Sequence, residues 1–184
     1  GGVGGAERGE KRRLQELANQ NAGLALEADT AKTEQSRLRR VEALEELREV
    51  LNLESLPLRI ECFDVSNIQE ESPVASMVVF QDATPKKAHY RKFGIRGMDG
   101  QDDYAALAEA VSRRFARVGS ATQEEYDEGF APAPNLVVID GGKGQLSAAI
   151  DAARALDMGE VTFVSLAKKE EEIFLPGRVD SLRL

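Results

Sequence analysis

Two aspartates, Asp64 and Asp140, lie near the ends of two short apolar runs of the chain. A carboxylate at the end of a buried strand is costly unless another group compensates its charge, and two facing carboxylates repel each other. A shared Mg²⁺ or Mn²⁺ ion would remove both costs, because oxygen ligands suit these hard cations. Such an ion can bind a phosphate oxygen and stabilise an in-line displacement. Aspartate before Ser-Asn or Gly-Gly is also a good turn former, so a turn-capping role stays open.

A glycine-rich loop, 141–144, directly follows Asp140 and contains Lys143. The loop does not have the Gly-x-x-x-x-Gly-Lys-Ser/Thr frame of a nucleotide-binding P-loop, and Gln145 stands at the hydroxyl position. Glycines between a strand and a helix still let an anion approach the helix N-terminus. Lys143 is therefore a candidate contact for a DNA phosphate or for the acidic pair, with a solvated loop lysine as the alternative.

The chain has one clearly basic stretch, residues 85–97, which contains no acid. A strand with this composition and interleaved aromatic residues could follow a phosphate backbone. Lysine and arginine on an edge strand that resists aggregation would explain the same residues without DNA. Lys168, after the last predicted strand, is a further candidate partner for a phosphate or a carboxylate. The candidate DNA contacts of the basic stretch are Lys86, Lys87, Arg91, Lys92 and Arg96.

Residues 1–56 are predicted to form a helical arm, because residues 10–52 are rich in helix formers and repeat their apolar positions at helical spacing. A polar stretch at 29–33 predicts a break between two helices, and Pro57 marks the boundary to a second domain, 57–184.

The second domain has the pattern of an α/β fold. A three-stranded antiparallel meander followed by a right-handed crossover places the fourth strand beside the first, which predicts a mixed sheet of order 3-2-1-4-5. Asp64 and Asp140 then lie at the carboxyl ends of neighbouring strands, where open α/β sheets bind ligands. The expected elements are strands at 58–65, 74–80, 88–95, 135–139 and 161–166, helices at 104–115 and 145–156, and an exposed loop at 119–134.

The charge balance argues against a generic nucleic-acid coat protein, since 24 Lys and Arg stand against 32 Asp and Glu, a net charge of −8. Residues 119–136 alone contain four acids and no base. Cys62, the single cysteine, fits a reducing compartment and a core position, and His89 is expected on a strand surface far from both aspartates. No apolar run is long enough to cross a membrane, so the expected location is the cytoplasm.

The sequence resembles the C-terminal half of the UvrC family, which belongs to the bacterial nucleotide excision repair endonuclease. The likeness covers nearly the whole chain, and the two aspartate motifs together are highly specific. It rests on Arg59-Ile60-Glu61-Cys62-Phe63-Asp64-Val65-Ser66-Asn67, on Tyr90-Arg91-Lys92-Phe93, on Ile139-Asp140-Gly141-Gly142-Lys143-Gly144-Gln145-Leu146 and on Glu171-Glu172-Ile173-Phe174-Leu175-Pro176-Gly177.

The resemblance implies an RNase H-like endonuclease domain that incises damaged double-stranded DNA on the 5′ side of a lesion, after UvrA and UvrB have located it. The family's catalytic set is Asp-Asp-His, with Asp64 and Asp140 matching the aspartates and the histidine lying beyond Leu184. We therefore expect a fragment that binds metal weakly and incises poorly. The alternatives are a non-catalytic module that docks on DNA or protein, and a nucleotide-binding protein built on the glycine loop.

Overall fold

The chain divides into two compact units, Gly1–Ala43 and Leu44–Leu184. Residues 44–56, which the sequence assigns to the arm, group with the second unit. A computed structural model of the chain describes residues 4–66, 73–95, 102–119, 127–167, 172–178 and 181–183.

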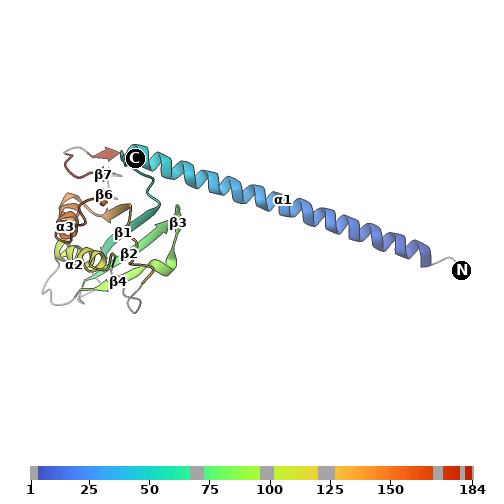
Figure 1. Cartoon of the computed structure of the whole chain (residues 1–184), viewed down its shortest axis with the longest axis horizontal. Helices are drawn as coiled ribbons and strands as arrows, with labels where there is room; N and C mark the ends of the chain where they lie inside the picture. The colour runs from blue at the N-terminus through green and yellow to red at the C-terminus, as the bar shows by residue number, and fades with distance from the viewer. Residues whose placement is uncertain are drawn as a thin grey trace. The chain divides into compact units, whose positions relative to one another are not determined.

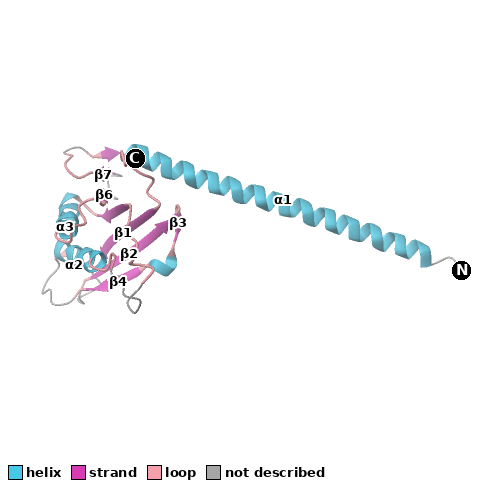
Figure 2. Cartoon of the chain, viewed as in Figure 1, coloured by secondary structure: helices cyan, strands magenta, loops and turns pink. Residues whose placement is uncertain are grey.

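Helix α1 (Gly4–Val50) runs without interruption, so the predicted break at 29–33 is wrong (Figure 2). The polar residues in this stretch are accommodated within the helix. The hydroxyl groups of Thr30 and Thr33 donate to the carbonyl oxygens of Leu26 and Asp29, at 2.8 and 2.9 Å. Because residues 24–50 contain neither proline nor glycine, local hydrogen bonding is enough to carry the helix through.

Only the end of α1 buries apolar side chains among the described residues. Leu44 and Leu51 are buried within the second unit, whereas Leu17, Leu24 and Leu38 in the first unit are each about half exposed. Amphipathic packing, predicted for the whole stretch, is thus confined to its last turns. No helix in the described part of the chain is long and apolar enough to cross a membrane.

The second unit is built on a mixed sheet whose described strands follow the order β3-β2-β1-β5-β6-β7-β8, with β4 also paired to β2 (Figure 1). The segment β4-β2-β1-β5-β6 confirms the predicted 3-2-1-4-5 order. The strands are β1 (Arg59–Ser66), β2 (Val74–Gln81), β3 (Thr84–Pro85), β4 (Arg91–Gly94), β5 (Leu136–Asp140), β6 (Thr162–Ala167), β7 (Glu172–Phe174) and β8 (Leu182–Arg183).

The strand expected at 88–95 is shorter than predicted and has a different beginning. Asp82 and Ala83 adopt φ values of 53° and 56°, which turn the chain sharply so that β3 returns along the end of β2. A 3-10 helix, η1 (Lys87–His89), then separates β3 from β4. Proline at the end of β3 lacks the N–H that would extend the strand, so pairing resumes only at Arg91.

Two helices cover one face of the sheet. Helix α2 (Asp103–Phe115) packs on β1 and β2, and α3 (Lys143–Arg154) packs on β5 and β6 (Figure 1). The Asp102 carboxylate caps α2 by accepting from the Ala105 N–H at 3.0 Å. The core between helices and sheet contains Phe63, Val111, Ile139 and Phe163, while a second cluster around Leu51, Leu136, Val164 and Ile173 lies on the other face.

The loop expected to be exposed at 119–134 is anchored at its described end. Residues 120–126 lie outside the described part, but Phe130 and Pro134 are buried. The Phe130 ring meets the Phe93 ring edge to face, with 6.2 Å between centroids. The Phe130 side chain supplies apolar surface that holds this end of the loop against the core.

Candidate functional site

Asp64 and Asp140 lie side by side at the carboxyl ends of two adjacent parallel strands. In the register between β1 and β5, Phe63 stands opposite Ile139, and the next residue on each strand is one of the two aspartates. Neighbouring strands are about 4.8 Å apart, and laterally paired residues point to the same face. The predicted adjacency of Asp64 and Asp140 is therefore confirmed.

The two carboxylates point to the face opposite α2 and α3. Phe63 and Ile139 are fully buried beneath those helices, and alternation along each strand directs Asp64 and Asp140 the other way. Asp64 is exposed and Asp140 is half-buried. The carboxylate oxygens of Asp64 and Asp140 are therefore accessible to a ligand that approaches from solvent.

Cys62 is the neighbour of the acidic pair on this face. Burial raises the pKa of the Cys62 thiol to about 11, and the charges of Glu61 and Asp140 contribute to that rise. At neutral pH the thiol therefore stays protonated and adds no negative charge beside the aspartates. Cys62 is half-buried and belongs to neither core cluster, so the predicted core position is only partly met.

Among the described residues, the acidic pair is the candidate for holding a metal ion. No group of three His, Cys, Asp or Glu side chains that could hold an ion occurs among them. Two carboxylates provide hard oxygen donors of the kind that Mg²⁺ and Mn²⁺ prefer, and water or phosphate commonly fills their remaining positions.

A lysine extends the acidic pair into a row across the sheet. Asp64 pairs with Ser76 of β2, and Ser76 pairs with Lys92 of β4. Two strand spacings separate the backbones of Asp64 and Lys92, about 10 Å, and the pairing puts all these side chains on one face. Lys92 is exposed, so its ammonium group can contact an anion that lies over the acids.

The other predicted DNA contacts separate into distinct places. Arg91 neighbours Lys92 but points to the helix side of β4, where it forms an ion pair with Asp127. Lys86 and Lys87 lie by η1, near the opposite end of β2, about 17 Å along the strand from Ser76. Arg96 and Lys168 fall outside the described residues.

The glycine loop has a structural role that the sequence did not reveal. The Gln145 Oε1 atom accepts from the Gly142 N–H at 2.8 Å and so caps α3. A side chain at Gly141 would overlap that same Oε1 atom, and one at Gly144 would approach the Tyr104 ring to 2.9 Å. The residue at the P-loop hydroxyl position therefore closes a helix cap.

Lys143 begins α3 and lies over the Phe174 ring, with 5.1 Å from Nζ to the ring centroid. It lines a cavity of about 290 Å³ together with Phe174, Arg154 and Arg178. Its side chain thus lies between α3 and β7. Although Lys143 is close to Asp140 in the sequence, its side chain points to a separate groove.

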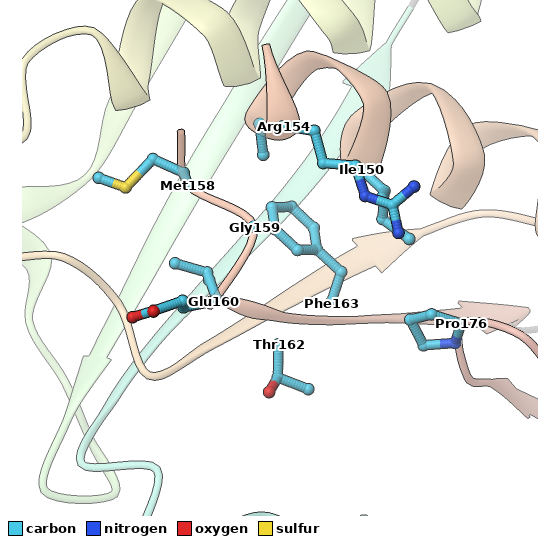
Figure 3. A pocket seen from close by; sticks show the side chains of 10 residues that line it. Ile150, Arg154, Met158, Gly159, Glu160, Thr162, Phe163 and Pro176 are labelled. Carbon is cyan, nitrogen blue, oxygen red and sulfur yellow. The ribbon is translucent and has the colours of Figure 1, made fainter. Parts of the chain in front are cut away.

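That groove continues into a cavity of about 200 Å³ lined by Ile150, Arg154, Phe163 and Pro176 (Figure 3). Arg154 and Glu160 lie on opposite sides of Phe163 in this view. The cavity lies at the beginning of β6, whereas Asp140 ends β5. It is therefore separate from the acidic pair.

Residues 48–184 match the family model described as the UvrC RNAse H endonuclease domain. The chain belongs to this family. Its RNase H-like fold agrees with the sheet order and with the helices on one face.

Relatives of this UvrC domain align with nearly the whole chain. The chain is 47% identical to UvrABC system protein C of Carboxydothermus hydrogenoformans over 181 residues, covering 97% of this chain and 30% of that protein. It is 45% identical to the same protein of a Parafrankia species over 196 residues, covering 92% of this chain and 28% of the relative. The chain thus spans about a third of their length.

A solved structure with a similar backbone is Ciona intestinalis endonuclease V in complex with a 24mer DNA containing an inosine followed by a ribo-adenosine. The match has a TM-score of 0.42 and 14% identity, and it covers 73% of this chain and 58% of that one.

A buried ionic network in the UvrC domain went unnoticed in the sequence. Glu61, fully buried on the helix side of β1, accepts from Arg114 Nε and Nη2 at 2.9 and 2.7 Å and from Arg59 Nε at 2.9 Å. The two guanidinium groups also donate to the carbonyl oxygens of Gly129, Phe130 and Pro132, at 2.7, 2.7 and 2.6 Å. The network joins β1, α2 and the described loop at 127–134, and Glu61 lies three residues before Asp64.

His89 belongs to this network and not to the acidic pair. Its Nδ1 lies 3.1 Å from Arg59 Nη1, at the opposite end of β1 from Asp64. Partial burial lowers the pKa of His89, and the charges of Arg59, Lys86 and Arg91 lower it further. The neutral ring can accept a hydrogen bond from the Arg59 guanidinium group. His89 therefore lies far from the aspartates, as the sequence predicted.

Proposed function

We propose that this chain is the catalytic core of a metal-dependent DNA endonuclease, the one that makes the 5′ incision beside a lesion in UvrABC nucleotide excision repair. The observation that supports this most strongly is the pairing of Asp64 with Asp140 on one open sheet face. Membership of an endonuclease-domain family supports the reaction class. A docking module would have no need for two repelling carboxylates at adjacent strand ends.

Asp64 and Asp140 would together hold Mg²⁺ or Mn²⁺. Their carboxylates fit such an ion because each offers hard oxygen donors, and a cation between them would offset their mutual repulsion. When bound, the ion supplies positive charge for the phosphate oxygens and acidifies water for attack on phosphorus.

The surrounding residues position the substrate. Lys92, on the same face and about two strand spacings from Asp64, would hold a neighbouring phosphate by charge. Exposure of Asp64 leaves the site open to a strand of DNA. Cys62 remains a neutral thiol, so the local negative charge is that of the acids.

The substrate and partners in this proposal follow the family. Damaged double-stranded DNA would be the substrate, with UvrB, loaded by UvrA, delivering the longer protein to the lesion. The names of the relatives support a place in that system, since both are UvrABC system protein C.

Asparagine substitutions in the full-length protein test the proposal. Asp64→Asn and Asp140→Asn keep size and polarity but remove the charge, so each should reduce 5′ incision of a lesion-containing duplex at least about 100-fold in the presence of UvrA, UvrB and Mg²⁺. Asp157→Asn is the matched control, since Asp157 is exposed at a turn with φ 58° that asparagine tolerates. Incision within about threefold of wild type by either site variant would refute the role.

A further inference from the structure

Helix α1 has a stripe of apolar side chains that no described part of the chain covers. Every side chain from residue 15 to residue 39 is exposed, including Leu17, Leu24 and Leu38. These residues belong to the unit Gly1–Ala43, whose described residues all lie in this one helix. Helices in proteins gain most of their stability by packing an apolar face against a partner. The stripe is therefore a candidate interaction surface.

The stripe repeats every seven residues, which is the period of a coiled coil. Apolar side chains recur at one position of the repeat, the d position, and polar or small side chains stand four residues later, at the a position. The resulting seam is about 32 Å long, at 1.5 Å per residue. The d positions are Leu17, Leu24, Ala31 and Leu38, and the a positions are Asn21, Ala28 and Gln35.

Charged residues flank this seam with opposite signs on its two sides. Glu27 and Glu34 occupy g positions, and Lys32 and Arg39 occupy e positions. Among the described residues, no ion pair involves Glu27, Lys32 or Arg39. Glu34 pairs with Arg37 at 2.7 Å, but both side chains are more than half exposed. Because such an exposed pair is weak, Glu34 can also meet a cation across the seam.

This charge pattern fits a second copy of the same helix in parallel orientation. In a parallel, in-register pair, each g residue meets the e residue five positions later on the other helix. Glu27 then meets the partner's Lys32, and Glu34 meets the partner's Arg39. In an antiparallel pair g meets g and e meets e, so acids would face acids and bases would face bases. The charges therefore favour one orientation and oppose the other.

Asn21 favours the same arrangement. A single asparagine at an a position specifies the register of parallel dimers, at a cost in stability. Its side-chain amide both donates and accepts, so it can bond to the partner's Asn21 across the seam. A slip of one heptad would set Asn21 against the partner's Ala28 and leave the amide without that partner.

We propose that α1 forms a parallel, in-register, two-stranded coiled coil with α1 of a second copy of this chain, through residues 17–39. Because two of the three a positions are polar, the dimer is weak, with a Kd of about 10–100 µM. The inference is independent of the proposed function, since it uses no residue of the acidic pair. Loss of one in an experiment leaves the other standing.

Sedimentation velocity of the 184-residue protein tests the pairing. From about 2 to 400 µM the mass should rise from that of the 20.1 kDa monomer towards twice that value. Leu24→Ala removes apolar surface from the seam and should weaken dimerisation at least about 10-fold, without lowering helix propensity. Leu26→Ala is the matched control, because Leu26 is 69% exposed, against 58% for Leu24, but lies at an outer f position. Its effect should stay within about twofold.

A charge reversal tests the flanking pairs. Lys32→Glu with Arg39→Glu sets acids against Glu27 and Glu34 of the other copy and should weaken dimerisation at least about 10-fold at low salt. Adding Glu27→Lys with Glu34→Lys restores opposite charges across a parallel seam, so dimerisation should return to within about threefold of wild type.

The control for this reversal changes the same number of charges on the outer side of the helix. Arg37→Glu with Arg40→Glu alters positions c and f, and should weaken dimerisation less than about threefold. The proposal is overturned if the wild type stays monomeric at about 400 µM. It is also overturned if Leu26→Ala matches Leu24→Ala, or if the outer reversal matches the reversal beside the seam.

Cross-linking tests the orientation. In a Cys62→Ser background, Asn21→Cys places one thiol of each copy in the same layer of a parallel pair, within reach of a disulfide. Diamide should then oxidise most of this variant to a covalent dimer, whereas Leu26→Cys, on the outer side, should cross-link at least about 10-fold more slowly. Equal rates for the two variants would overturn the parallel seam.

Discussion

Asp64 and Asp140 occupy corresponding positions on two parallel strands, each one residue beyond the fully buried pair Phe63 and Ile139. The buried pair locks the register, because a slip of one residue would move both apolar side chains to the open face. The same packing that stabilises the sheet thus fixes the separation of the two carboxylates.

The buried carboxylate of Glu61 should dominate the stability of the domain. Glu61→Gln leaves Arg59 and Arg114 buried without their counter-charge, which we expect to lower the free energy of unfolding by about 3–5 kcal/mol. Glu109→Gln is the control, since its pair with Arg113 is half exposed and should matter by less than about 1 kcal/mol. Urea unfolding measures both, and equal effects would contradict a structural role for the network.

Much of this architecture was readable from the sequence, because its signals are local. Apolar runs with β-branched residues marked β1, β2, β5 and β6, and chain-handedness rules then gave their order. The proximity of Asp64 and Asp140 followed from that order, since parallel neighbours end at the same edge.

The parts that were missed depend on contacts distant in the sequence. Glu61 looks like an ordinary polar strand residue until Arg114, 53 residues later, is placed against it. The basic stretch gave no sign that Arg91 pairs with Asp127, which follows it by 36 residues. The prediction of a break in α1 was wrong for a local reason, because threonine hydroxyl groups can donate to backbone carbonyl oxygens one turn earlier in the same helix.

Gly141 should be intolerant of a side chain, unlike its neighbour. A Cβ at Gly141 would overlap Gln145 Oε1 and open the α3 cap, whereas nothing lies within 4 Å of a Cβ at Gly142. We expect Gly141→Ala to lower the free energy of unfolding by about 1–2 kcal/mol and Gly142→Ala to change it by less than about 0.5 kcal/mol.

A double variant identifies the cause of the Gly141 effect. Adding Gln145→Ala removes the atom that clashes, so the two substitutions together should cost less than the sum of their separate effects. Strict additivity in chemical unfolding would show that the Gly141 side chain clashes elsewhere.

His89 should make the domain less stable in mild acid. The pKa of His89 is lowered in the folded state, so the unfolded chain binds more protons than the folded chain in mild acid. The free energy of unfolding should therefore fall as the pH drops from about 6.5, the ordinary pKa of histidine, towards the pKa of the folded state. His89→Gln keeps an acceptor for Arg59 without titrating, and should flatten the dependence between about pH 7.5 and 5.5. If urea unfolding gives the same pH dependence of the free energy of unfolding for wild type and for His89→Gln, His89 does not cause the loss of stability in acid.

Divalent cations should stabilise the domain through the acidic pair. If Mn²⁺ binds with a Kd of about 1 mM, about 10 mM Mn²⁺ adds about 1.4 kcal/mol and raises the Tm by roughly 3 °C. The shift should vanish in Asp64→Asn and in Asp140→Asn and persist in Asp157→Asn. A shift of equal size in all three variants would mean that the ion binds elsewhere.

The most direct measurement of the central claim is the anomalous scattering of Mn²⁺ in crystals of the 184-residue protein soaked with that ion. We predict a peak between Asp64 and Asp140, with an oxygen of each carboxylate about 2.0–2.3 Å from the ion. A peak bound by one aspartate alone, or no peak at the ends of β1 and β5, would contradict a shared metal site.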